Sequence, residues 1–268
     1  MYNLRRMPLA WQVIHALDDR RVLATSPAEL RALARTVLDA GGDALLCFRA
    51  ADNHLHSVLL ADRATVGVFG RLVANTLHHR LRLPVPFEPT RFRPVHDQGH
   101  LRSVFGYVLG NAEHHGAGHD PFFEASNLPD LLGLREVGAA TRTRVRAALP
   151  RVDRAALLTL LGVDALAPRF AAEHLLASAC AVAGLPSLEQ RTSEALAARI
   201  AAAHLAARHV SAHDLEAILH VSARTGARLR AAAANPALVT GIALQMDLRA
   251  RKNIAALTAP YGSAGLAS

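Results

Sequence analysis

The first 115 residues alternate between segments of strand and helix character, and this order constrains the fold more than any other feature. Ser26 followed by Pro27 and Glu29 is typical of a helix start, and Gly41-Gly42 is typical of a helix end. The predicted elements are a strand pair at 12–23 turning at Asp18-Asp19, a helix at 26–40, a hairpin of strands at 43–48 and 54–60 with its turn at 50–53, a helix at 63–82, an extended segment near 91–93 and a helix at 97–115. This succession predicts an α+β fold with helices against a small antiparallel sheet.

The second half of the sequence has a different pattern. From Ala117 to about Pro150 the periodicity weakens and glycines and prolines interrupt it, which indicates a domain junction. The rest is rich in Ala and Leu, and it predicts helices at about 152–161, 168–183, 187–208, 211–219, 223–233 and 236–248. We therefore expect an α+β domain over residues 1–135 and an all-α domain over residues 136–268.

Composition narrows the class of partner. A formal net charge of +8 favours a polyanion, nucleic acid first, although the near-total preference for Arg over Lys is also what a GC-rich genome produces. Cys47 and Cys180 have no paired spacing, and no stretch approaches 18 uninterrupted apolar residues. We expect a cytoplasmic, nucleoid-associated protein that makes no membrane contact and is a monomer or a homodimer.

Two short motifs carry the residues best suited to chemistry. His54 and His56 are two apart in an apolar run, so on a strand both imidazoles point to one face and can hold a divalent metal. Tyr107 and Asn111 are four apart on the predicted helix and also share a face. Separately, such residues are more often surface or core side chains, but a metal pair combined with a tyrosine favours phosphodiester cleavage through a covalent tyrosine link.

These motifs resemble those of a known family. Asn53-His54-Leu55-His56 is similar to the His-hydrophobic-His strand of HUH-type single-tyrosine transposases, in which Asn commonly precedes the first His. Tyr107-Val-Leu-Gly-Asn111 resembles the tyrosine helix of the REP-associated tyrosine transposase branch, and Asp120 to Arg135 resembles the family's segment after that helix. The resemblance covers about residues 10–135.

The resemblance implies a ferredoxin-like HUH nuclease domain. It implies that His54, His56 and Asn111 bind Mg²⁺ or Mn²⁺, and that Tyr107 is the nucleophile. The implied activity is a single-strand DNA endonuclease and strand-transferase that forms a 5′-phosphotyrosine intermediate on hairpin-bearing DNA. Three positions depart from the family: Asp52 stands where Pro is often found, Gly106 where Arg is frequent, and Ala112 where Pro follows the Asn.

Other functions remain open. The departures are also what a domesticated, non-catalytic DNA-binding protein would accumulate. A relaxase is disfavoured because relaxases place the tyrosine ahead of the histidines, and Tyr107 follows them here. A replication initiator often carries two tyrosines on one helix, whereas residues 97–115 contain one.

Residues 211–232 have the rhythm of a helix-turn-helix. Leu215, Ile218 and Leu219 would pack the first helix, and Ser222 would cap the second. The second helix would present Arg224, Thr225, Arg228 and Arg230 to DNA. His220 occupies the turn where Gly is usual, so a two-helix corner within an α-bundle is the competing interpretation.

Overall fold

The computed structural model describes residues 7–19, 21–110, 120–160 and 170–251, which form two compact units. The first unit holds the described residues up to Leu128 together with Ala140–Ala156, and the second holds Pro129–Ala139 and the described residues from Leu157 onward. The chain therefore passes between the units three times from Leu128 to Leu157. The domain boundary expected at 135/136 falls inside a segment of the second unit and stays a prediction.

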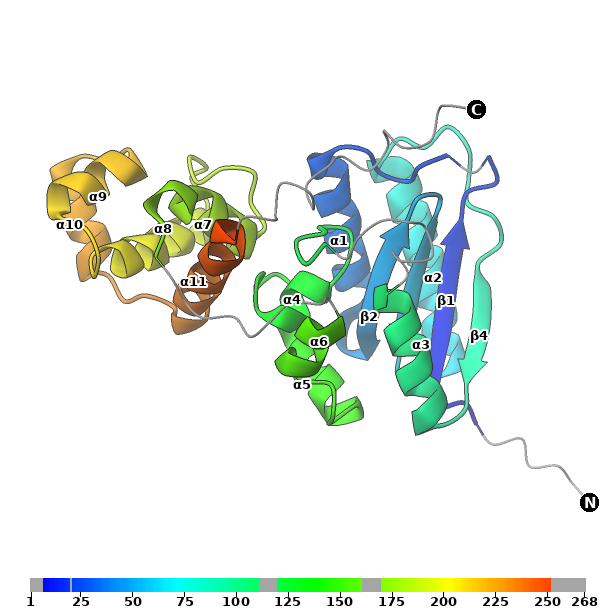
Figure 1. Cartoon of the computed structure of the whole chain (residues 1–268). Coiled ribbons are helices and arrows are strands. Elements are labelled where there is room, and N and C mark those ends of the chain that lie inside the picture. The colour runs from blue at the N-terminus through cyan, green and yellow to red at the C-terminus, as the bar shows by residue number, and fades with distance from the viewer. Residues whose placement is uncertain (1–6, 20, 111–119, 161–169, 252–268) are drawn as a thin grey trace, which may run out of the picture. The chain divides into compact units, whose positions relative to one another are not determined.

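A four-stranded antiparallel sheet forms the centre of the first unit (Figure 1). Its strands are β1 (Ala10–Ala16), β2 (Leu45–Ala51), β3 (His54–Leu59) and β4 (Arg91–Val95), arranged in the order β2-β3-β1-β4. The helices are α1 (Pro27–Gly41), the short η1 (Gly42–Ala44), α2 (Arg63–Arg80) and α3 (Gln98–Gly110). The expected α+β class and the antiparallel sheet are confirmed.

The strand pair expected at 12–23 is wrong. β1 is a single strand that pairs with β3 on one side and β4 on the other, and the chain leaves the sheet after Ala16. The charged residues Asp18 and Asp19 follow the strand, and the backbone N–H of Leu23 donates to Asp52 O at 2.7 Å. Leu23 therefore anchors a loop at the end of the β2–β3 hairpin and forms no strand.

The hairpin that carries the histidines is tighter than expected. β2 continues to Ala51, which pairs with His54, so the turn consists of Asp52 and Asn53 alone. Asp52 has a φ of 35°, in the left-handed region that Asp tolerates better than most residues. Proline is fixed near −65° and cannot adopt this conformation, which gives a physical reason for its absence here.

Helices cover both faces of the sheet, with α1 and α2 on one face and α3 on the other (Figure 1). The capping box of Ser26 and Glu29 starts α1 as predicted. The core under α1 and α2 takes one set of alternating strand residues, including Val13, Leu55 and Leu59. The other set, which includes His54 and His56, therefore faces α3.

The segment around Asn127, after the tyrosine helix, lines the outer edge of β2. Asn127 accepts a hydrogen bond from the Phe48 N–H at 3.0 Å and donates one to Leu46 O at 3.0 Å. The Ala50 N–H donates to Ala125 O at 2.9 Å. Pairing of this kind covers backbone groups that an edge strand would otherwise expose.

Every element in the described part of the second unit is a helix. Its main elements are η3 (Ala172–His174), α7 (Leu175–Ala183), α8 (Ser193–Ala206), α9 (Ala212–Leu219), α10 (Ala223–Ala231) and α11 (Pro236–Ala250). Earlier in the chain, α4 (Leu128–Leu132), α5 (Ala139–Ala148) and α6 (Arg154–Leu160) occupy the region where the sequence predicted mostly a junction. In the described ranges, no helix has the length and apolar character needed to span a membrane.

Short side chains allow the second unit to pack closely. α8 buries Ala198, Ala201 and Ala202, and a Cβ at Gly241 of α11 would lie 3.0 Å from Gly133 O. α8 begins later than predicted because Thr192 caps it through the Ala195 N–H.

A buried ion pair lies near the start of this unit. Arg135 donates to both carboxylate oxygens of Asp130, at 3.0 and 2.5 Å, and the Gly138 N–H adds a third bond at 2.8 Å. Together these bonds satisfy a carboxylate that is fully removed from solvent.

Candidate active site

The predicted histidines lie on β3 with their rings side by side. The ring centroids of His54 and His56 are 4.7 Å apart and nearly perpendicular. The alternation of the strand produces this, since residues two apart project from the same face. His54 is partly exposed and His56 is 5% exposed, so one imidazole lies toward solvent and the other in the floor of the site.

Asn53 fixes the tautomer of His54. Its Oδ1 lies 2.9 Å from His54 Nδ1, and a carboxamide oxygen can only accept, so the Nδ1–H donates. The neutral ring then carries its lone pair on Nε2, and this nitrogen can bind a metal.

Gln12 of β1 contacts the second histidine. Gln12 Nε2 lies 3.2 Å from His56 Nδ1, and both residues are buried. In this orientation the amide donates to Nδ1, so the ring proton is on Nε2. If the amide turned over, Oε1 would accept from Nδ1–H and the lone pair would move to Nε2. The side chain of Gln12 thus determines whether His56 can bind a metal through Nε2.

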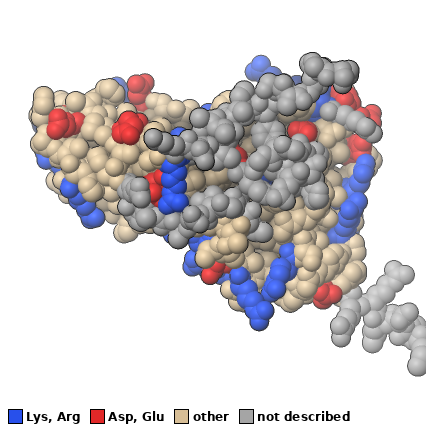
Figure 2. Space-filling model, viewed as in Figure 1, with Lys and Arg blue, Asp and Glu red and all other residues tan. Residues whose placement is uncertain are grey.

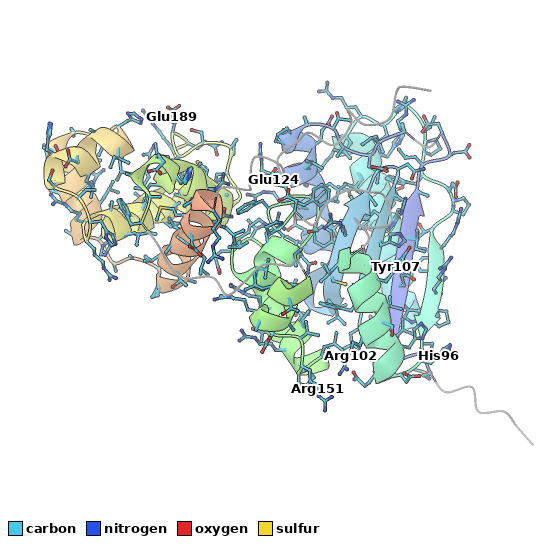
Figure 3. All side chains as sticks on the ribbon, in the orientation of Figure 1. His96, Arg102, Tyr107, Glu124, Arg151 and Glu189 are labelled. Atoms are coloured by element: carbon cyan, nitrogen blue, oxygen red, sulfur yellow. The ribbon has the colours of Figure 1, made fainter. Side chains whose placement is uncertain are left out.

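Tyr107 lies next to His56, from the opposite side of the site. Its ring centroid is 5.6 Å from that of His56, at an interplanar angle of 86°. Figure 3 labels Tyr107 on α3, in front of the sheet. Leu101, Phe105 and Val108 bury the inner stripe of α3, which leaves Tyr107 on the flank with 44% of its surface exposed. A tyrosine in this position is accessible to a macromolecular substrate.

Asp97 holds the start of the tyrosine helix. Its carboxylate accepts a hydrogen bond from the His100 N–H at 2.8 Å, and this bond lowers the pKa of Asp97. An acidic cap of this kind stabilises the first turn and the position of α3. The predicted extension of the helix to 115 and the predicted ligand Asn111 lie outside the described residues.

The two imidazoles suit a divalent transition metal. Nitrogen ligands favour Mn²⁺ over Mg²⁺, which prefers oxygen. The tautomer of His54 fits a metal as it stands, and that of His56 fits once Gln12 presents its oxygen. Among the described residues, no cluster of three or more His, Cys, Asp or Glu side chains is placed to hold a metal.

The four predicted DNA-contacting residues of the second unit do not share one face. Arg224 and Arg228 are exposed and lie about 40° apart around α10. Arg230 lies on the other side of the helix with a buried Nε, and Thr225 bonds the capping Ser222. The cap and the buried positions of Leu215 and Leu219 agree with the prediction. The basic face of α10 is therefore a pair of arginines.

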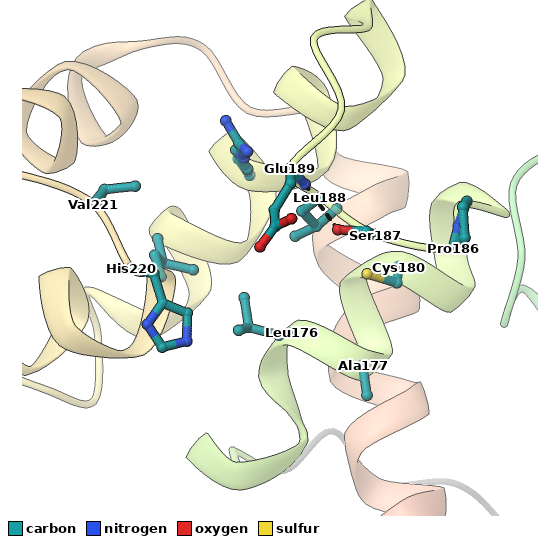
Figure 4. Close-up of a pocket in the computed structure, with 11 residues that line it drawn as sticks. Leu176, Ala177, Cys180, Pro186, Ser187, Leu188, Glu189, His220 and Val221 are labelled. Atoms are coloured by element: carbon teal, nitrogen blue, oxygen red, sulfur yellow. Dashed lines mark hydrogen bonds between the residues drawn. The ribbon is translucent and has the colours of Figure 1, made fainter.

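The second unit also contains a pocket, beside the turn between α9 and α10 (Figure 4). Its volume is about 330 Å³, and its walls are mainly the apolar side chains of α7, of the segment after α7 and of the turn. Glu189, Arg199 and His220 add charged or polar groups to the lining. His220 reaches the pocket from a left-handed backbone conformation, at a φ of 51°.

Sequence reasoning missed Gln12, which contacts His56, and did not place Arg91 and Arg93 on the histidine face of the sheet. All three belong to the same face of the sheet as His56, because Gln12 pairs with Val58 and Arg93, and Ile14 pairs with His56 and Arg91. The alternating segment Arg91-Phe92-Arg93 was a signal for two basic residues on one face of a strand. Nothing local in the sequence indicates which strands lie next to each other.

Comparisons with known proteins give one remote likeness. No protein-family model matches the sequence, and no curated protein matches it. A solved structure that is similar is a REP-associated tyrosine transposase bound to a REP hairpin, at 19% identity and a TM-score of 0.35, covering 43% of this chain and 75% of that chain. This TM-score is too low to assign a family, so the site is interpreted from its own residues.

Proposed function

We propose that this chain is a tyrosine-dependent single-strand DNA endonuclease and strand-transferase of the HUH type, acting as a transposase on hairpin-bearing DNA. The observation that carries the proposal is the meeting of Tyr107 with the histidine pair, at 5.6 Å from the ring of His56. The β-α-β-β-α-β order and the strand order β2-β3-β1-β4 support a ferredoxin-like nuclease domain.

His54 and His56, completed by Asn111, would hold Mn²⁺ or Mg²⁺, which would neutralise charge on a phosphate oxygen. Other side chains orient the two histidines and supply the nucleophile. Asn53 orients His54, and Gln12 orients His56. Tyr107, presented on the flank of α3, supplies the attacking oxygen.

The proposed reaction needs no external energy source. The Tyr107 oxygen forms a bond to phosphorus as its phenolic proton passes to solvent, and the bond from phosphorus to the 3′ oxygen breaks. The departing 3′ oxygen takes up a proton and becomes a free 3′-OH. A second strand's 3′-OH reverses these steps, so one phosphodiester is exchanged for another. The 5′-phosphotyrosine conserves the bond energy between the two steps.

A covalent-trapping experiment tests this function. The full chain is incubated with single-stranded hairpin DNA and Mn²⁺, and the protein–DNA adduct is separated on a denaturing gel. We expect an adduct that Tyr107→Phe abolishes and that His54→Ala and His56→Ala reduce strongly. Tyr2→Phe is the matched control, because it removes a phenol that the proposed reaction does not use. No adduct over a varied set of hairpins, or an adduct that survives Tyr107→Phe, contradicts the proposal.

A non-catalytic DNA-binding protein is the second candidate, and α9 and α10 favour it. A three-residue turn joins them, Ser222 caps α10, and Arg224 and Arg228 are exposed together. We expect Arg224→Ala with Arg228→Ala to weaken duplex-DNA binding, with Arg208→Ala as the control. Duplex binding without any adduct would favour this candidate over the nuclease.

A further inference from the structure

Packing under the sheet fixes the direction of the β4 side chains. Phe92 points to the face covered by α2, where the Arg63 guanidinium lies 3.9 Å from its ring centroid. A Cβ at Gly70 would lie only 3.0 Å from Phe92, so the absence of a side chain there makes room for the ring. With Phe92 held on this face, its neighbours Arg91 and Arg93 must project from the other face.

Strand register places those arginines beside the site. Arg93 pairs with Gln12, whose amide contacts His56, and Arg91 pairs with Ile14, which pairs with His56. Adjacent strands are about 4.8 Å apart, so the backbone of Arg91 is about 10 Å from that of His56. The two arginines are separated by about 7 Å along β4. They can therefore contact two different phosphates of a strand that reaches Tyr107.

The charged side chains that the strands place on this face are all basic. The other residues that the four described strands place there carry no carboxylate: Ala10, Gln12, Ile14, Ala16, Cys47, Arg49, Ala51, His54, His56, Val58 and Val95. Arg91 and Arg93 are exposed, and Figure 2 shows basic side chains along the β4 edge of the sheet. Glu88 forms an exposed ion pair with Arg91, which is a weak interaction that a phosphate can replace.

We propose that Arg91 and Arg93 form a phosphate-binding strip that holds the backbone of single-stranded DNA beside Tyr107. The inference rests on the proposed function, and it assigns the part of the surface along which the substrate strand runs. Guanidinium groups bind phosphate oxygens through paired hydrogen bonds, and such contacts position the strand without reading its sequence. The strip is therefore independent of base identity, and hairpin recognition belongs to other parts of the surface.

The test is a salt-dependent binding measurement on the full chain carrying Tyr107→Phe, so that no cleavage occurs. A fluorescein-labelled single-stranded oligonucleotide is titrated at several salt concentrations without metal. We expect the double variant Arg91→Ala, Arg93→Ala to bind about tenfold more weakly at low salt, and the slope of log K against log salt to shrink by about 1.4. Arg93→Lys keeps most of the slope, since the charge remains.

Arg71→Ala is the matched control, because Arg71 is exposed on α2 at the other face of the sheet. An unchanged slope in the double variant, a loss as large in Arg71→Ala, or no binding by the Tyr107→Phe protein overturns the strip. Circular dichroism confirms that each variant is folded. Failure of the strip can be distinguished from failure of the nuclease. If the parent forms the covalent adduct but the double variant binds DNA as tightly as its Tyr107→Phe background, the strip is wrong. If DNA binding depends on Arg91 and Arg93 but no adduct forms, the nuclease is wrong.

Discussion

Gln12 Nε2 lies 3.2 Å from Nδ1 of His56, across the pairing between β1 and β3. A metal at His56 Nε2 requires the opposite polarity, with an oxygen accepting from Nδ1–H. The carboxamide can supply either polarity by turning over, a carboxylate supplies only an acceptor, and an alanine supplies neither.

This contact predicts an order of metal affinity. We expect Gln12→Glu to bind Mn²⁺ at least as tightly as the parent, and Gln12→Ala to bind roughly 10- to 100-fold more weakly. Titration calorimetry or the electron paramagnetic resonance of free Mn²⁺ gives the affinity without any DNA. If Gln12→Glu binds more weakly than Gln12→Ala, the role given to Gln12 is wrong.

The hairpin turn predicts a sharp difference between two substitutions at Asp52. With a φ of 35°, Asp52→Pro forces the backbone out of the turn and costs about 3 kcal/mol or more of unfolding free energy. Asp52→Asn tolerates the left-handed region and changes the unfolding free energy by less than about 0.5 kcal/mol. Urea denaturation measures both. Equal stability of the two variants would contradict the turn geometry.

His15 predicts a loss of stability in mild acid. Burial lowers the pKa of His15 to about 4, because the charged imidazolium would lose its hydration there. The hydrogen bond between Nε2 and Gly70 O, at 3.0 Å, opposes this shift only in part, and Nδ1 has no partner among the described residues. Below pH 6.5 the unfolded chain takes up a proton that the folded chain refuses until about pH 4. The unfolding free energy therefore falls by up to about 3 kcal/mol as the pH drops through this window.

The measurement is urea denaturation from pH 4 to pH 8, compared between the parent and His15→Leu. We expect His15→Leu to be less stable at neutral pH but to lose less stability between pH 6.5 and pH 4. His213→Ala, at an exposed position, is the control and should keep the parent profile. Identical pH slopes in the parent and His15→Leu would remove His15 as the cause.

The sequence correctly predicted those features of the fold that are determined by residues only a few positions apart. The Ser26 capping box, the histidine hairpin and the Ser222 cap all depend on residues a few positions apart, and all are present. The strand pair expected at 12–23 was wrong because the apolar residues of β1 pair with strands far along the chain.

In the candidate site too, relations within one element were predictable from the sequence and contacts between distant elements were not. Residues two or four apart on one element, such as His54 and His56, could be grouped from the sequence. The contact of Gln12 with His56 spans 44 positions and depends on the strand order, which no local pattern encodes. The meeting of Tyr107 with His56 was a hypothesis that rested on the combination of residue types and on a family resemblance, and its distance comes from the packing of α3.

Gly106 precedes Tyr107 on α3, at a position where the resembling family often carries Arg. A Cβ here meets nothing within 4 Å, so a side chain can be added without displacing a neighbour. Gly106→Ala should raise the unfolding free energy by about 0.5–1 kcal/mol, because glycine is a poor residue in the interior of α3. Gly70→Ala is the opposing control and should lower it by about 1–3 kcal/mol, since its Cβ would crowd Phe92.

Gly106→Arg adds a charge next to Tyr107. We expect it to tighten single-stranded DNA binding several-fold at low salt and to increase the slope of log K against log salt by about 0.7, the value for one further phosphate contact. Gly106→Gln has a side chain of similar character without the charge, and it separates electrostatics from helix stabilisation. If Gly106→Arg and Gly106→Gln bind DNA equally at low salt, the strand does not pass this side of α3, because a guanidinium within reach of a phosphate must respond to salt.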